Sequence, residues 1–184
     1  MRVQRLEGDQ PYDGTQLSTT FVDRHAPGEG DVLLLFEGPA DVPVEHLVDL
    51  EDAEAGAVIA SERMAHLIVE HRDLDLAGGV LAQRLLMRLA ARWLEQRAGA
   101  LLDVQGDDLY LHERKLSVSV ATRSPRGILI HTALNVTTEG TPVPTAGLRD
   151  LRVPAGEFLR EVGRLYADEW TSMVHAQGKV RPVP

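Results

Sequence analysis

Four short apolar runs follow one another closely between residues 101 and 136, and their spacing constrains the fold more than any other feature of the chain. They are Leu101 to Val104, Leu109 to Leu111, Leu116 to Val120 and Ile128 to Val136. Each run has the length of a strand, and the connections between them are tight. The sequence therefore predicts an antiparallel meander in this region.

Two longer segments have the apolar spacing of amphipathic helices. In Leu76 to Arg97 leucines recur every three or four residues, and Gly99 is placed to end the helix. Ala155 to His175 has the same character and follows Pro154. Long helices beside an antiparallel sheet, without repeated strand-helix-strand alternation, predict an α+β domain with helices on one face. With 184 residues and 43% apolar content, we expect a single domain over residues 1–184.

The first half of the chain has fewer signals. Tyr12-Asp13-Gly14-Thr15 has the residues of a turn, and a short helix is predicted from about Gln16 to Asp23. The apolar run Val32 to Phe36 predicts a central strand buried on both faces, and Met64 to His71 is nearly apolar. Val42 to Glu54 is mixed and acidic, which indicates a surface loop or a short edge strand and no metal site.

Composition excludes several classes of function. The 28 acidic and 19 basic residues give a net charge of −9, which disfavours binding to nucleic acid. The chain has no cysteine, so disulfides, thiolate zinc sites and thiol nucleophiles are excluded. No apolar run approaches the roughly 18 residues of a membrane span. We therefore expect a soluble cytoplasmic protein that does not bind membranes.

Lys115 stands just before a strand with period-two alternation. Because apolar residues alternate in Leu116 to Val120, we expect Lys115, Ser117 and Ser119 to share the opposite face. One ammonium and two hydroxyls in a row suit an anionic or carbonyl ligand. On the next strand His131 and Asn135 share a face, which would complete a pocket floor beside the serines.

The same stretch resembles a known family. Asp108-Leu109-Tyr110-Leu111, followed after two residues by Arg114-Lys115-Leu116, is similar to the Asn-Asp-Leu-Tyr-Leu and Arg-Lys-Leu-Ala-Gly strands of biotin-protein ligases. Leu134-Asn135-Val136 resembles their Gly-Ile-Asn-Val strand. Lipoate-protein ligases share the Asp-to-Lys spacing and have a histidine near the position of His131. The whole chain looks most like the uncharacterised prokaryotic DUF366 family, which is grouped with the ligase fold. The resemblance implies a mostly antiparallel sheet with helices packed on it, as in the class II aminoacyl-tRNA synthetase and biotin/lipoate ligase catalytic core.

The resemblance also implies roles for individual residues. The lysine of the ligases that matches Lys115 reaches the acyl carboxylate and the α-phosphate, and Asp108 matches a position that helps to hold Mg²⁺ on ATP. His131 would carry a proton. Each residue also has a plainer interpretation: an exposed edge lysine, a turn aspartate and a packed histidine.

One region departs from the ligase pattern. Where the ligases carry glycine- and arginine-rich loops that bind phosphate, this chain has Ser61-Glu62-Arg63-Met64-Ala65-His66, without a glycine pair. Arg63 and His66 remain candidates to hold a carboxylate or phosphate.

These observations predict an enzyme of ligase or acyltransferase type that acts on a small carboxylate or acyl ligand through Lys115, with ATP and Mg²⁺ as implied cofactors. The alternatives are an acyl transferase that needs no ATP and a non-catalytic protein that binds a nucleotide or carboxylate. An exposed edge strand, and the row of Arg84, Arg88 and Arg92 on the first long helix, leave room for a homodimer.

Overall fold

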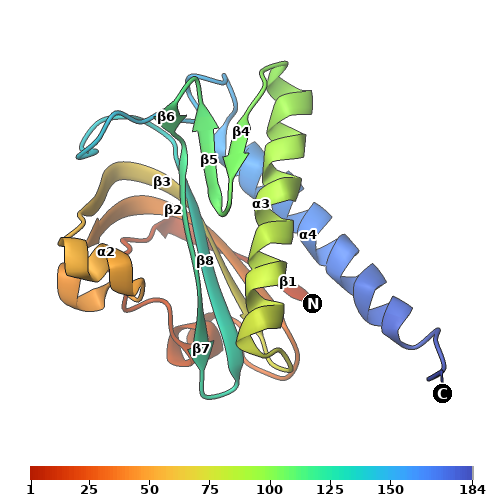
Figure 1. Ribbon diagram of the computed structural model, residues 1–184. Coiled ribbons are helices and arrows are strands. Elements are labelled where there is room, and N and C mark those ends of the chain that lie inside the picture. Colours follow the sequence, from red (N-terminus) through yellow and green to blue (C-terminus); the bar gives the residue numbers. More distant parts are fainter. Residues whose placement is uncertain (184) are drawn as a thin grey trace.

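The computed structural model describes residues 1–183, and a five-stranded sheet organises them (Figure 1). The strand order is β1-β2-β3-β8-β7. β1 runs parallel to β2, and the other neighbours are antiparallel. The strands of this sheet are β1 (Arg2–Asp9), β2 (Val32–Val42), β3 (Ile59–His71), β7 (Ser117–Ser124) and β8 (Gly127–Asn135). The fold is therefore α+β with a mostly antiparallel sheet, as the sequence predicts.

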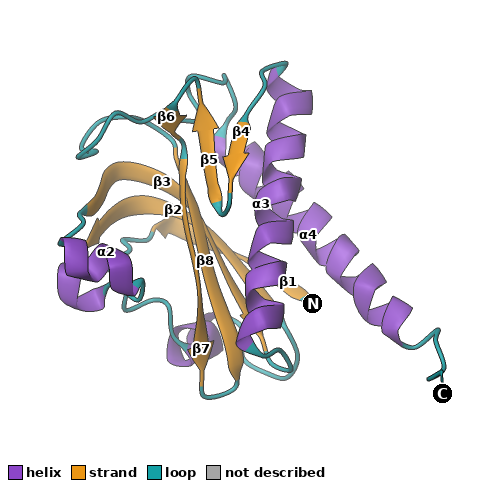
Figure 2. Cartoon of the chain, in the orientation of Figure 1, coloured by secondary structure: helices purple, strands orange, loops and turns teal. Residues whose placement is uncertain are grey.

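Two long helices, α3 (Leu76–Ala98) and α4 (Ala155–Gln177), cover one face of this sheet. The short helices α1 (Thr19–His25) and α2 (Leu50–Ala55) lie on the other side, as Figure 2 shows. The predicted placement of helices on one face is therefore confirmed for the two long helices, whereas the two short ones lie on the other face. β2 is buried on both faces because Leu33 and Leu35 pack beneath the long helices, whereas Leu34 and Phe36 pack on the α1 side.

Local signals in the sequence account for the long helices. The Asp75 side chain accepts a hydrogen bond from the backbone N–H of Gly78 and so caps α3, and Gly99 ends it in a left-handed conformation with φ +66°. α4 begins directly after Pro154. Both predicted helices are confirmed within two residues at either end.

The predicted meander is split between two sheets. β4 (Asp103–Gln105), β5 (Asp108–Leu111) and β6 (Arg114–Lys115) form a separate three-stranded sheet, whereas β7 and β8 belong to the large one. Leu116 marks the crossing: its N–H donates to the Leu109 carbonyl at 2.7 Å, and its carbonyl accepts from the N–H of Asn135 at 3.0 Å. The backbone bonds of this residue thus connect the two sheets.

Two elements have weak sequence signals. β1 is an edge strand in which only Leu6 is buried, so it lacks the apolar alternation that marks a strand. α2 lies inside the stretch expected to be a loop or a short edge strand, and the short 3₁₀ helix η1 (Val44–His46) precedes it. Asp49 caps α2 by accepting hydrogen bonds from the N–H groups of Glu51 and Asp52. With six residues and no buried side chain, α2 has no apolar stripe to reveal it.

Candidate functional site

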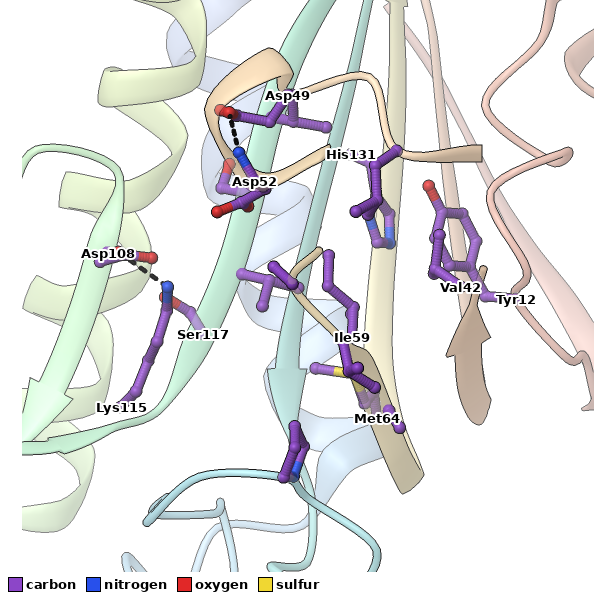
Figure 3. A pocket seen from close by; sticks show the side chains of 18 of the residues that line it. Tyr12, Val42, Asp49, Asp52, Ile59, Met64, Asp108, Lys115, Ser117 and His131 are labelled. Carbon is purple, nitrogen blue, oxygen red and sulfur yellow. Dashed lines mark hydrogen bonds and ion pairs between the residues drawn. The ribbon is translucent and has the colours of Figure 1, made fainter. Parts of the chain in front are cut away.

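A pocket of about 430 Å³ lies over the sheet face opposite α3 and α4. Its walls come from the α2 segment, the β5–β6 hairpin and the loop from Thr141 to Thr145, and its floor comes from β3 and β8 (Figure 3). Apolar side chains, among them Val42, Ile59 and Met64, line it together with polar groups from separate parts of the chain.

Lys115 enters the pocket from the hairpin. Asp108 and Tyr110 are two residues apart on β5, and Lys115 on β6 pairs with Tyr110, so all three side chains project from one face of the small sheet. The Lys115 ammonium lies 2.9 Å from a carboxylate oxygen of Asp108, as Figure 3 shows. About a third of the lysine side chain, 35%, is exposed. Asp108 and Lys115, to which the resemblance gives separate roles, thus form a direct ion pair at the pocket wall.

The floor carries His131 and Asn135, as predicted for a shared face of one strand. In the register of β3 and β8, His131 pairs with Ile68 and Asn135 pairs with Met64, and both polar residues line the pocket. His131 and Asn135 are only 4% and 5% exposed. Their side chains can therefore contact only other residues of the protein or a molecule inside this pocket.

The hydrogen bonds of the two buried histidines fix which nitrogen carries the proton. Nε2 of His66 lies 3.2 Å from the carbonyl oxygen of Gly38, which can only accept, so this nitrogen is a donor. Burial lowers the pKa of His66 to about 4, so the ring is neutral near pH 7 and its Nδ1 is an acceptor. His131 Nε2, at 3.1 Å, therefore donates to it.

His131 is left with an acceptor. Burial, and secondarily the neighbouring His66, holds the pKa of His131 well below its usual range. The neutral ring donates through Nε2, so its Nδ1 carries a lone pair, and no residue in the range 1–183 donates to it. This nitrogen is a hydrogen-bond acceptor offered to a ligand.

Tyr12 is a lining residue that the sequence marks only as part of a turn. Its N–H donates to the Pro39 carbonyl at 2.9 Å, and its carbonyl accepts from the N–H of Asp41 at 3.0 Å, so this segment is attached along the end of β2. The ring stacks on His131 with centroids 3.9 Å apart (Figure 3). Its proximity to His131 depends on tertiary structure, and no local pattern reveals it.

Ser117 and Ser119 do not share a face with His131. Val118 and Val120 pair with Ala133 and His131 on the pocket side, so the serine side chains point toward α3. The Ser117 hydroxyl accepts from the N–H of Leu109 at 2.9 Å, and Ser119 bonds to Gln83 and Thr132. The predicted common face is wrong because β6 and β7 are separate strands. Both serines border the pocket, but their hydroxyls already have partners in the protein.

Arg63 and His66 do not converge on one anion. Arg63 lies on the face of β3 that is turned toward the long helices, and its guanidinium forms ion pairs with Glu37 at 2.9 Å and Asp9 at 3.3 Å. It does not line the pocket. His66 is fully buried, neutral and bonded through both nitrogens. The segment from Ser61 to His66, which lacks the glycine pair of the ligases, lies within the continuous strand β3, Ile59–His71.

The charge of the lining is predominantly negative. Five carboxylates border the pocket, whereas Lys115 is its one lysine or arginine among residues 1–183. The carboxylates belong to Asp49, Glu51, Asp52, Asp107 and Asp108. Two side chains of α3 contact the carboxylate of Asp107. The Gln83 amide donates a hydrogen bond to it at 2.8 Å, and the Arg84 guanidinium lies 3.5 Å away. Within the described chain, no three His, Asp or Glu side chains are grouped as a metal site would require.

Solved structures identify the class of fold. The chain resembles a biotin protein ligase from Aquifex aeolicus in complex with biotin and ATP, with a TM-score of 0.61 and 14% identity over 91% of this chain and 69% of the ligase. It also resembles a putative lipoate protein ligase from T. acidophilum with bound lipoic acid, with a TM-score of 0.62 and 14% identity over 91% and 85% of the two chains. The fold is that of the biotin/lipoate ligase catalytic domains.

The family follows from similarity along the whole chain. The family model described as "Domain of unknown function (DUF366)" matches residues 1–181, and the chain belongs to this family. The uncharacterized protein MJ0805 of Methanocaldococcus jannaschii is 32% identical over 165 residues, which are 86% of this chain and 74% of that protein. A protein of unknown function from Pyrococcus horikoshi has a TM-score of 0.95 and 32% identity, with 100% of each chain covered. Across residues 1–183, no helix is long and apolar enough to cross a membrane.

Proposed function

We propose that the chain binds a small acyl compound in this pocket and transfers its acyl group, with Lys115 stabilising the negative charge that develops on the carbonyl oxygen. The observation that carries the proposal is the Lys115 ammonium at the wall of a 430 Å³ pocket, held at 2.9 Å by Asp108. An ammonium has three N–H donors, so the bond to Asp108 leaves others for a ligand oxygen. A compact cation already in position needs little rearrangement in the transition state.

The apolar lining supports an acyl ligand. Val42, Ile59, Met64 and Val118 provide aliphatic surface beside the polar groups, which suits the chain of a small acid or its ester. The solved lipoate ligase relative holds lipoic acid, a small carboxylate. This proposal assigns His131 to recognition, because its depressed pKa makes it a weak proton carrier near pH 7.

ATP and Mg²⁺ are the cofactors that the fold implies, and the biotin ligase relative holds ATP. The residues of this pocket do not fit a nucleoside triphosphate. The lining has five carboxylates against one cation, and that cation already pairs with Asp108. The remaining candidate cation, Arg63, is neutralised on the other face of β3. We therefore propose that a nucleophile, an amine, an alcohol or water, attacks the carbonyl carbon of an already activated ester without ATP. The bond to the ester's alcohol or thiol breaks, and this group leaves with the proton that the nucleophile loses.

Ester cleavage by wild-type protein and Lys115→Met tests this proposal. Nitrophenyl esters of short aliphatic acids release coloured nitrophenolate when the acyl group is transferred to water or to an added amine. Removing one donor to a developing oxyanion typically costs on the order of 10²-fold in rate, so we expect Lys115→Met to lose most of the activity. The control is Lys179→Met, because Lys179 is the other lysine of the chain and does not line the pocket. Equal rates in wild type and Lys115→Met would contradict the proposal.

Loss of fold is a separate explanation that the same variants exclude. The Lys115–Asp108 pair is partly exposed, and such pairs contribute roughly 0 to 1 kcal/mol to stability. The free energy of unfolding of Lys115→Met should therefore differ from that of wild type by no more than about 1 kcal/mol.

ATP binding is tested separately by thermal unfolding. A ligand that binds only the folded state raises the Tm, and because ATP does not fit the pocket, adding ATP with Mg²⁺ should leave the Tm unchanged.

A second candidate function is binding without catalysis. The ion pair between Lys115 and Asp108 favours it, because a paired lysine is less available to a reacting oxygen. In this case small acyl compounds would raise the Tm of the wild-type protein while the esters stay intact.

A further inference from the structure

Three largely buried side chains line the pocket, and each has a polar atom without a hydrogen-bond partner among residues 1–183. Tyr12, His131 and Asn135 are 5%, 4% and 5% exposed. Within residues 1–183, no hydrogen bond involves the Tyr12 hydroxyl, the side-chain amide of Asn135 or Nδ1 of His131. None of these atoms is sealed off from solvent, so they open to the cavity that all three residues border. Leaving such groups unpaired when a ligand displaces water is costly, so the ligand must supply partners.

His131 restricts what that partner can be. The Gly38 carbonyl makes Nε2 of His66 a donor, and the bond between the two histidines then leaves Nδ1 of His131 with a lone pair. A lone pair accepts and cannot donate. The ligand group that reaches His131 therefore carries an N–H or O–H. The Tyr12 hydroxyl beside it can accept as well, and Asn135 serves either type of partner.

Charge restricts the partner further. Glu51 and Asp52 in the first turn of α2 border the pocket, and neither has an ion-pair partner among the described residues. Asp107 and Asp108 border it from the hairpin, where their charges are offset by Arg84 and Lys115. Acceptors that surround a partly apolar cavity attract a cation and repel an anion.

We propose that the ligand is an aliphatic compound with a positively charged nitrogen, an ammonium or guanidinium, which binds between the Tyr12–His131–Asn135 floor and the acidic α2 rim. If the proposed function holds, the substrate is an acyl compound with this cation on its chain and its carbonyl toward Lys115. Only the identity of the substrate as an acyl compound rests on the proposed function. The evidence for the cation site is the set of unpaired acceptors in the pocket.

A matched series of amides tests the cation site without turnover. The compounds 6-aminohexanamide, hexanamide and the monoamide of adipic acid share an amide end and a chain, and they end in an ammonium, a methyl and a carboxylate. Calorimetric titration of the wild-type protein should show 6-aminohexanamide binding at least roughly tenfold more tightly than hexanamide. The adipic acid monoamide should bind more weakly than either. Hexanamide or the monoamide binding as tightly as the amine, or no binding of the amine, would overturn the inference.

Variants locate the site. Tyr12→Phe keeps the ring stacked on His131 and removes only the hydroxyl, so it should weaken binding of 6-aminohexanamide roughly tenfold and leave hexanamide unchanged. Glu51→Gln with Asp52→Asn should weaken the amine a few-fold and reduce its salt dependence. Glu54→Gln is the control, since Glu54 lies on α2 but does not border the pocket. If Tyr12→Phe and the Glu51→Gln, Asp52→Asn double variant both still prefer 6-aminohexanamide over hexanamide as strongly as wild type does, the ammonium binds elsewhere and the inference is overturned.

The two proposals fail separately. Lys115→Met should lower the rate of ester cleavage by on the order of 10²-fold and keep the preference for 6-aminohexanamide over hexanamide. A wild-type protein that prefers the amine but cleaves no ester contradicts the acyl-transfer proposal alone. A protein that cleaves esters through Lys115 but shows no preference for the amine contradicts the cation site alone.

Discussion

Nε2 of His131 lies 3.1 Å from Nδ1 of His66 across two neighbouring strands, and the other nitrogen of His66 bonds to the Gly38 carbonyl. This pair lies among aromatic rings, with Phe36 stacked on His66 and Tyr12 stacked on His131. Burial lowers the pKa of both rings, so both are neutral near pH 7. The pair is therefore both a hydrogen-bond acceptor in the pocket and a source of pH-dependent stability.

The free energy of unfolding should fall as the pH decreases from about 6.5 to about 4. Burial lowers the pKa of His66 to about 4 in the folded protein, whereas an unfolded histidine titrates near 6.5. In this window the unfolded chain binds more protons than the folded one, so stability decreases as the pH falls. His66 alone should account for about 2 kcal/mol between pH 7 and pH 5, and His131 acts in the same direction.

Urea denaturation at these two pH values measures the effect, with His66→Gln as the comparison. Glutamine can still donate to the Gly38 carbonyl but does not titrate. The loss of stability on acidification should therefore be smaller in the variant than in wild type by about 2 kcal/mol. An identical loss in both proteins would show that His66 accepts a proton while folded.

Gly38→Ala should destabilise the protein and displace Tyr12. A Cβ at position 38 would overlap the backbone carbonyl of Gln10, because the segment before Tyr12 crosses directly over this glycine. The conflict is with backbone, so it cannot be relieved by rotating a side chain, and overpacking of this kind costs about 1 to 3 kcal/mol. Denaturant unfolding should show that loss, and 6-aminohexanamide should bind more weakly. Gly178→Ala provides the control, because the nearest atom to its added Cβ is 3.6 Å away; a comparable loss there would refute the steric explanation.

Sequence patterns account for the elements whose signals are local. The leucine spacing and the caps at Asp75 and Gly99 define α3, and the motif from Asp108 to Lys115 identifies a pair that is in contact. His66 and His131 are 65 residues apart in the sequence, and the bond between them depends on the register of β3 and β8, which no local pattern encodes.

The direction of the serines could not be predicted for a related reason. Alternation assumes one continuous strand, but the chain changes sheets at Leu116, between Lys115 and Ser117. Arg63 is three residues before His66, so in a continuous strand the two side chains lie on opposite faces, and Glu37 neutralises Arg63 on its face. Both errors concern which face of a sheet a side chain occupies, and this depends on where each strand begins and ends.

Asp31 joins α4 to the sheet, and removing its carboxylate should destabilise the protein more than removing any one of its donors. One oxygen accepts from His71 at 3.1 Å and from the Trp170 indole at 2.6 Å, and the other accepts from the N–H of Arg72 at 3.0 Å. Asp31→Ala leaves three donors without their acceptor and should cost about 2 to 4 kcal/mol. Trp170→Phe removes one donor and should cost about 1 kcal/mol beyond any loss of packing. Equal effects of the two substitutions in thermal unfolding would show that Asp31 contributes nothing through His71 and Arg72.

The hairpin that presents Lys115 should become more stable when its turn residues are replaced. His112 and Glu113 connect β5 to β6 with φ values of +47° and +63°, which side chains of this size adopt at a cost. A two-residue hairpin turn with two positive φ values favours Asn-Gly. The double substitution His112→Asn with Glu113→Gly should raise the free energy of unfolding by about 1 kcal/mol. Neither residue lines the pocket that contains Lys115, so ester cleavage should be unchanged. A stability equal to or below that of wild type in urea denaturation would indicate that contacts of the native His112 or Glu113 side chain compensate for the strain.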